Sequence, residues 1–272
     1  MAPAGSSASS GRRRSSNAEM AYTPAELLAA TASRLLADHR IVFAGVGAPL
    51  LASVLAKSTH ASHLTVVVEG GVVGLEVLPG RLPISTNEMR AGRRAVMLPS
   101  ITQTFLYAQR GFFDYGFLGG AQIDPHGNIN TSVIGPADRP RVRLPGSGGA
   151  CDIISLCREI FIVTTHERRR FVEKLDFVTS PGYLGGGDAR RRAGLLFGEV
   201  TTVLTDLALM RFDAQTRRMR IDALQAGVSI DDVRQRTGFE LAVAPELANV
   251  PPPTSEELHI LRMLDPERIY LG

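Results

Sequence analysis

The chain has few cysteines, no long apolar run and little net charge, and each shortage excludes a class of protein. Two cysteines among 272 residues, Cys151 and Cys157, cannot form the disulfide framework of a small secreted domain. No pair of His or Cys residues has the spacing of a zinc site, so the sequence predicts no metal site. No apolar run reaches the ~20 residues that a membrane-spanning helix needs, so we expect no membrane contact.

The formal net charge is only +3, and it comes from Arg rather than Lys. A basic patch with interleaved aromatic residues is absent, which argues against a nucleic-acid partner. Two clusters, Arg168–Arg170 and Arg190–Arg192, fit either a solvated surface or contact with an anion or a partner chain. The N-terminus lacks the apolar core of a secretory signal. We therefore expect a reduced, cytoplasmic, enzyme-like protein.

Composition also divides the chain. Residues 1–20 are rich in Ser, Ala, Gly and Arg, so we expect a disordered N-terminal extension. The remainder, residues 21–272, is long enough to bury a sizeable core and shows neither a repeat nor a clear linker. It is therefore predicted to form a single domain.

Strand-like and helix-like patterns alternate along this domain. Ordered structure begins at a capping box, Thr23 to Glu26, with Pro24 at the first helical position. Helices are expected at 24–38, 50–57, 101–110, from about 151, at 229–237 and from 254; strands are expected at 41–44, 64–69, 95–99, 112–118, 159–164, 200–210 and 219–223. The alternation predicts an α/β fold with an open, mostly parallel sheet flanked by helices.

One stretch gives this scaffold a candidate reactive group. The β-branched run Thr65–Val68 ends in a carboxylate, Glu69, followed at once by Gly70 and Gly71. Ligands of open α/β sheets bind outside the carboxyl ends of the strands, where Glu69 is expected to lie. The two glycines are expected to leave room for a ligand. The alternative is that Glu69 is only a solvated surface charge.

Two glycine-rich turns precede helices. Gly45-Val46-Gly47 resembles part of a dinucleotide-binding fingerprint, but position 50 is Leu instead of the third glycine, which argues against a nicotinamide cofactor. The second turn, 145–150, can direct backbone N–H groups toward an anion or a developing oxyanion. The alternative for this turn is a flexible connection. A third loop, 179–187, has a length that suggests a lid or a partner contact. His166 is expected to cap or pair rather than catalyse.

Together these stretches resemble the B (β) subunit of family I CoA-transferases, nearest to the glutaconate CoA-transferase type. The resemblance runs from about residue 22 to 265. The matching stretches are Val67–Gly71, Gly119–Asn130, Gly146–Ala150, His166–Phe171, Val178–Gly182 and Thr237–Phe239. The pair Gly-Gly-Ala-Gln and Gly-Ser-Gly-Gly-Ala is the most specific part, and a CoA-transferase (NagB-like) fold is implied.

The resemblance implies that Glu69 is the nucleophile that attacks an acyl-CoA thioester and later carries CoA as a glutamyl thioester. It also implies an oxyanion site, for which the backbone N–H groups of Gly148 or Gly149 are candidates. Gln122 and Asn128 are expected to contribute to acyl-CoA binding. Coenzyme A is then a substrate, and no cofactor is expected. The acceptor is a carboxylic acid, dicarboxylic or 3-oxo in type.

Relatives of this kind act with an A subunit, so we expect a hetero-oligomer, A2B2, with no activity in the isolated chain. Some members have lost transfer chemistry and act as decarboxylases or ring-opening hydrolases on CoA esters. They replace the glutamate that this chain retains as Glu69. A third hypothesis is a non-enzymatic sugar-phosphate-binding module on a related fold.

Overall fold

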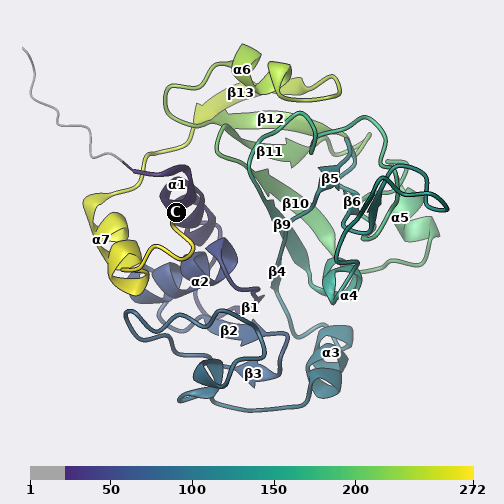
Figure 1. The fold of residues 1–272 in the computed structure, drawn as a ribbon. Helices are drawn as coiled ribbons and strands as arrows, with labels where there is room; N and C mark the ends of the chain where they lie inside the picture. The colour runs from purple at the N-terminus through teal and green to yellow at the C-terminus, as the bar shows by residue number, and fades with distance from the viewer. Residues whose placement is uncertain (1–21) are drawn as a thin grey trace, which may run out of the picture.

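A nine-stranded sheet organises the part of the chain that the computed structural model describes, residues 22–272 (Figure 1). The predicted disordered segment 1–20 lies outside these residues. From edge to edge the strands are β13 (Ala242–Asn249), β12 (Met219–Leu224), β11 (Ala208–Phe212), β10 (Glu199–Leu204), β9 (Glu159–Val163), β4 (Tyr115–Leu118), β1 (Ile41–Phe43), β2 (Thr65–Val68) and β3 (Val72–Val73).

The middle of this sheet is parallel. Strands β10, β9, β4, β1 and β2 are neighbours that all run the same way, whereas β3 and β11 pair antiparallel at either end of this group. The central strands are nearly continuous apolar runs because both faces are covered. The predicted α/β fold with an open, mostly parallel sheet is confirmed.

Helices cover the two faces. Figure 1 shows α1 (Pro24–Ser33), α2 (Ala48–Thr59) and α7 (Ser255–Leu264) grouped on one side, and α3 (Ile101–Gln109) and α4 (Ala150–Leu156) on the other. Each side has its own buried apolar cluster. The short helices are η1 (Met89–Gly92), α5 (Ala189–Arg192) and α6 (Ile230–Gln235). None of the helices within residues 22–272 has the length and apolarity to cross a membrane.

The chain order creates a switch point in the parallel sheet. From β1 the chain moves outward to β2, then returns to place β4 on the other side of β1. The loops that leave β1 and β4 therefore run in opposite directions, and a crevice opens between them at the carboxyl ends. This crevice is where the candidate site lies.

Two predicted strands differ from the structure, and one long strand was not predicted. The expected strand 200–210 is two strands, because Thr205, Asp206 and Leu207 turn the chain between β10 and β11. The expected strand 95–99 is absent apart from one bridge, Val73 to Met97. Strand β13 was not predicted, because Pro245 interrupts its pattern and most of its residues are exposed; proline is tolerated there because the strand is at an edge.

Helix starts agree well with expectation. Capping boxes at Thr23, Ser229 and Thr254 begin α1, α6 and α7. The first helix ends at Ser33, earlier than the predicted residue 38. Two short hairpins, β5 (Gln122–Ile123) with β6 (Ile129–Asn130) and β7 (Val133–Ile134) with β8 (Val142–Arg143), lie outside the main sheet.

Candidate active site

Glu69 lies in the turn directly after β2, at the carboxyl-end edge of the parallel strands. It lines a cleft of about 420 Å³ that also includes the ends of β1, β4 and β9. The cleft residues are Phe43, Ala44, Gly45, Val46, Pro49, Glu69, Thr86, Phe117, Leu118, Gly119, Ser147, Gly148, Gly149, Ala150, Ile153 and Val163. Four strands thus present their carboxyl ends to one cavity.

Glu69 and the glycine loop before α4 meet in this cleft. A Cβ built on Gly149 would lie 2.9 Å from Glu69 Oε1 and 2.6 Å from the Phe105 ring. Glycine at 149 therefore lets the carboxylate approach the backbone this closely, and a larger residue would displace the Glu69 or Phe105 side chain. Gly148 also lines the cleft, with φ +49° and open space where a Cβ would point. The structure brings together three of the five predicted site residues: Glu69, Gly148 and Gly149.

The loop is fixed by Ser147. Its carbonyl accepts from the Ala150 N–H at 3.0 Å, and its hydroxyl accepts from the Cys151 N–H at 3.1 Å. Among the backbone hydrogen bonds of residues 22–272, neither the Gly148 nor the Gly149 N–H donates to a backbone acceptor. These two donors are consequently free to bind a ligand oxygen at the cleft.

Glu69 is the only ionisable side chain in the described lining of the cleft. Aromatic and aliphatic groups, including Phe43, Phe117 and Leu118, form much of the remaining surface. The Glu69 carboxylate is half-buried beside these groups. The arrangement suits a nucleophile that works without a neighbouring base.

Gly70 and Gly71 do not provide the predicted space for a ligand. A Cβ on Gly70 would lie 2.2 Å from the Thr86 carbonyl oxygen, and one on Gly71 would lie 2.0 Å from that of Pro99. Gly71 also has φ +91°, which favours glycine. The glycines instead let the chain's own 86–100 segment pack against the turn that carries Glu69.

Gln122 does not line the cleft. The residue is 8% exposed and both ends of its amide are hydrogen-bonded: Nε2 donates to Asp176 at 2.9 Å, and Oε1 accepts from Asn130 Nδ2 at 2.7 Å. Oε1 also accepts from the Asp176 N–H at 3.1 Å. Gln122 therefore holds the β5–β6 hairpin to the segment around Asp176.

Asn128 is also outside the cleft lining and is buried. Its Oδ1 accepts from the N–H groups of Gly182 and Leu184 at 2.8 and 2.9 Å, and its Nδ2 donates to Asp124 at 2.7 Å. Asn128 thus holds the 179–187 segment, which was predicted to be a lid or a partner contact, against the body of the domain. Ser180 has no exposed surface, and a Cβ on Gly182 would collide with Gly127 at 2.3 Å.

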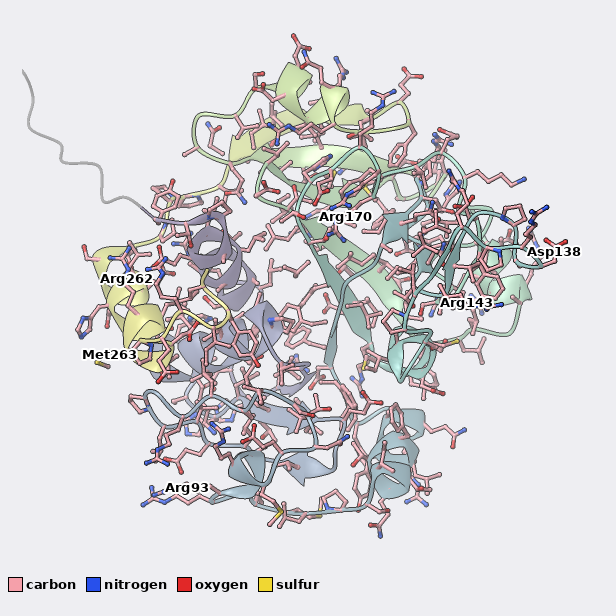
Figure 2. The ribbon with its side chains drawn as sticks, in the orientation of Figure 1. Arg93, Asp138, Arg143, Arg170, Arg262 and Met263 are labelled. Carbon is pink, nitrogen blue, oxygen red and sulfur yellow. The ribbon has the colours of Figure 1, made fainter. Side chains whose placement is uncertain are left out.

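The arginine clusters have mainly structural partners. Arg190 is 6% exposed and donates to the carbonyls of Gly182, Ile154 and Phe197, beside a separate cavity of about 720 Å³. Arg170 (Figure 2) donates to the Gly120 carbonyl at 2.9 Å and also pairs with Glu167, as does Arg169. Neither cluster contributes to the lining of the Glu69 cleft.

His166 is a buried structural group, as its predicted role in pairing implies. It stacks on Phe171 with 4.2 Å between ring centroids, and its two nitrogens contact the hydroxyls of Thr205 and Thr237, both at 3.0 Å. Burial lowers the pKa of the imidazole to about 4. The ring is therefore neutral at physiological pH.

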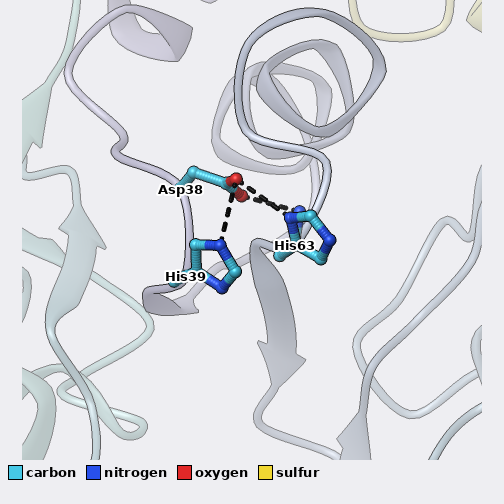
Figure 3. A group of neighbouring side chains, drawn as sticks. All are labelled: Asp38, His39 and His63. Atoms are coloured by element: carbon cyan, nitrogen blue, oxygen red, sulfur yellow. Dashed lines mark hydrogen bonds and ion pairs between the residues drawn. The ribbon is translucent and has the colours of Figure 1, made fainter.

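Sequence spacing missed one group of candidate metal ligands. Asp38, His39 and His63 come together where the loops before β1 and β2 meet (Figure 3). His39 and His63 are far apart in sequence and their loops are joined only by the fold, so no local motif marks them. They lie at the opposite ends of β1 and β2 from Glu69.

Comparison with known proteins places this geometry in a family. A family model described as "Coenzyme A transferase" matches residues 25–236. The chain is 36% identical over 246 residues to the B subunit of 3-oxoadipate CoA-transferase from Pseudomonas knackmussii, covering 90% of this chain and 94% of that protein. It is 33% identical over 257 residues to the B subunit of glutaconate CoA-transferase from Acidaminococcus fermentans, covering 92% and 95%.

Solved structures support the same family by their fold. The crystal structure of glutaconate coenzyme A-transferase from Acidaminococcus fermentans matches with a TM-score of 0.86 and 30% identity, over 92% of this chain and 98% of that chain. A structure of the decarboxylase AibA/AibB matches with a TM-score of 0.78 and 25% identity, over the same shares of the two chains. A protein named as a transferase and one named as a decarboxylase therefore share this fold.

Proposed function

Since the chain belongs to the coenzyme A transferase family, we propose that it is the B subunit of an enzyme that moves CoA from an acyl-CoA to a carboxylic acid through Glu69. The observation that carries this proposal is the Glu69–Gly149 juxtaposition in a cleft with no second ionisable side chain in its described lining. The names of the 3-oxoadipate and glutaconate relatives point to a dicarboxylic or 3-oxo acid as acceptor.

The first half-reaction loads the enzyme. A Glu69 carboxylate oxygen attacks the thioester carbonyl carbon, the C–S bond breaks, and CoA thiolate leaves a mixed anhydride on Glu69. The thiolate then attacks the glutamyl carbonyl carbon, the anhydride C–O bond breaks, and the original acyl group departs as a free carboxylate. Covalent catalysis of this kind divides one difficult transfer into easier steps and conserves the thioester.

The second half-reaction runs the same steps in reverse with a different acid. An acceptor carboxylate attacks the glutamyl thioester, CoA thiolate leaves, and the thiolate returns to the acceptor carbonyl. Glu69 is regenerated as a carboxylate and the new acyl-CoA leaves. No proton is gained or lost overall, which accords with Glu69 being the single titratable group that residues 22–272 contribute to the cleft lining.

Each attack produces a tetrahedral oxyanion that needs hydrogen-bond donors. The Gly148 and Gly149 N–H groups suit this role because they lie at the cleft and donate to no backbone acceptor within residues 22–272. Removing one donor of this type costs roughly 2.7–4 kcal/mol in transition-state stabilisation. Gln122 and Asn128 act indirectly in this proposal, by holding the neighbouring hairpin in shape.

A partner subunit completes the enzyme. The described lining of the cleft offers no Lys, Arg or His side chain to bind a second carboxylate of the acceptor. An A subunit would supply the remaining polar contacts, in an A2B2 assembly, and the isolated chain would be inactive. The two free cysteines agree with the cytoplasmic location expected from the sequence.

A decarboxylase or ring-opening hydrolase on the same scaffold is the second candidate, because the decarboxylase AibA/AibB shares the fold. Such a reaction needs a proton donor or an activated water in addition to CoA-ester binding. The cleft has one carboxylate and no other titratable group in its described lining, which favours transfer.

The test is CoA exchange by the chain co-purified with its A-type partner. Isotope-labelled free acid should enter the acyl-CoA pool with wild-type protein and fail to enter with Glu69→Gln, while circular dichroism stays unchanged. Exchange retained by Glu69→Gln contradicts the proposal. Formation of CO2 or free CoA without an acceptor acid supports the second candidate instead.

A further inference from the structure

Asp38, His39 and His63 form an exposed cluster at the end of the sheet remote from the candidate active site (Figure 3). Asp38 and His39 precede β1, and His63 precedes β2. Glu69 follows His63 by six positions of largely extended chain, which span about 20 Å. Any ligand held by this cluster is therefore independent of the cleft.

The two imidazoles share one carboxylate oxygen. His63 Nδ1 lies 3.0 Å and His39 Nε2 lies 3.6 Å from Asp38 Oδ2. Neighbouring ligand atoms of a tetrahedral zinc ion with usual Zn–N and Zn–O bonds are about 3.4 Å apart. The nitrogen–oxygen separations already present thus bracket the spacing that one ion requires.

The carboxylate is fixed before any ion arrives. Asp38 Oδ1 accepts a hydrogen bond from the His63 backbone N–H at 2.7 Å, which leaves Oδ2 directed at the rings. Within residues 22–272, the only ion-pair partners of Asp38 are the two histidines. No arginine or lysine of the described chain competes with a cation for this carboxylate.

The two histidine rings must rotate to bind one ion. They stack in parallel, with centroids 4.4 Å apart and 6° between planes, whereas an ion must lie close to the plane of each imidazole. Side-chain exposures of 74% for His39 and 65% for His63 leave both rings free to rotate. The ion would replace the 3.2 Å contact between Ser62 Oγ and His63 Nδ1.

We propose that Asp38, His39 and His63 bind one Zn²⁺ ion, which clips the loop before β1 to the turn before β2. Two imidazole nitrogens and one carboxylate oxygen are donors that suit Zn²⁺, and water takes the fourth position. The ion binds only when the fold brings the two loops together, so it stabilises the native state.

The test uses the full chain, free of any histidine tag and stripped with a chelator, titrated with Zn²⁺ by calorimetry. We expect one Zn²⁺ per chain, a Tm that rises with Zn²⁺ concentration, and affinity at least about 10-fold weaker in His63→Ala and Asp38→Asn. His259→Ala, which removes an exposed histidine on α7, should bind as wild type does.

Three results overturn the assignment. They are no Zn²⁺ binding by wild-type protein, undiminished Zn²⁺ binding by a His39→Ala/His63→Ala double variant, or a loss of Zn²⁺ affinity in His259→Ala as large as that in His63→Ala. CoA exchange by the complex with its partner should be the same with and without Zn²⁺. Failure of the zinc site and failure of the proposed transferase activity are therefore separate outcomes.

Discussion

Glu69 and Gly149, eighty residues apart in sequence, approach so closely that a methyl group on Gly149 would lie 2.9 Å from a carboxylate oxygen of Glu69. The contact joins the turn after β2 to the loop before α4 across the switch point of the sheet. It places a candidate nucleophile beside backbone donors on a rigid scaffold. Substitutions on either side of this contact test whether it has a catalytic role.

Gly149→Ala should abolish most CoA exchange. The added methyl group would lie 2.9 Å from a Glu69 carboxylate oxygen and 2.6 Å from the Phe105 ring, so the carboxylate, the ring or the loop must shift and the alignment of Glu69 with the N–H donors is lost. We expect kcat to fall by roughly 10²–10³-fold. The exposed Gly185, which has nothing within 4 Å of its Cβ position, gives a matched control in Gly185→Ala. Equal activity in the two variants would argue against the donor role.

Glu69→Asp tests position rather than charge. The carboxylate is kept but withdrawn by one methylene, so its oxygen no longer reaches the place where Gly148 and Gly149 donate. A displacement of about 1 Å at a reacting group can cost 10²-fold, and we expect a loss of that order in kcat with an unchanged Tm. Wild-type turnover in Glu69→Asp would mean that the carboxylate only contributes charge.

Asn128→Ala separates a structural role from substrate binding. Removal of the side chain leaves the N–H groups of Gly182 and Leu184 without their acceptor, at a cost of about 1–3 kcal/mol for each group that stays buried and unpaired. Urea denaturation should show a clear loss of stability, and the KM for acyl-CoA should stay near the wild-type value. A raised KM with unchanged stability would instead support the binding role predicted from the sequence.

The candidate active-site end of the sheet could be predicted from sequence because its signals are local. A β-branched run ending in Glu69 marks a strand terminus, and a glycine loop before a helix marks a donor site. That the two meet could not be read from either stretch, since their contact depends on strand order. The hydrogen bonds of Gln122 and Asn128 could not be predicted for the same reason: their partners Asp176 and Gly182 are each 54 residues away.

Other differences arise from packing. Gly70 was expected to admit a ligand, but the space next to it is taken by the Thr86 carbonyl, which no local pattern reveals. Strand β13 is mostly exposed and contains Pro245, so neither hydrophobic alternation nor propensity marks it. The Asp38–His63 contact likewise depends on two loops that only the parallel pairing of β1 and β2 brings together.

Buried His166 should make stability depend on pH. Its pKa is about 4 in the folded chain and near 6.5 when unfolded, so between these values the unfolded state binds more protons. Burial of His166 destabilises the folded state fully below pH 4 and has no such effect above pH 6.5. The free energy of unfolding should therefore fall by up to about 3 kcal/mol as pH drops through this range.

Denaturant titrations of wild-type protein and His166→Gln at several pH values measure this effect. The variant cannot take up the proton, so the difference between its unfolding free energy and that of wild type should narrow as pH falls. His259→Gln, which alters an exposed histidine, should show the same dependence of unfolding free energy on pH as wild type. A parallel pH dependence in wild type and His166→Gln would show that other groups cause it.

The most direct test is to trap the covalent intermediate on the complex with its A-type partner. After addition of acyl-CoA without acceptor, borohydride should reduce the glutamyl thioester to an alcohol, and peptide mass spectrometry should locate the change at residue 69. Loss of exchange activity should follow the extent of reduction. A fully active complex whose Glu69 peptide stays unmodified, or modification at any other residue of the chain, would contradict the account.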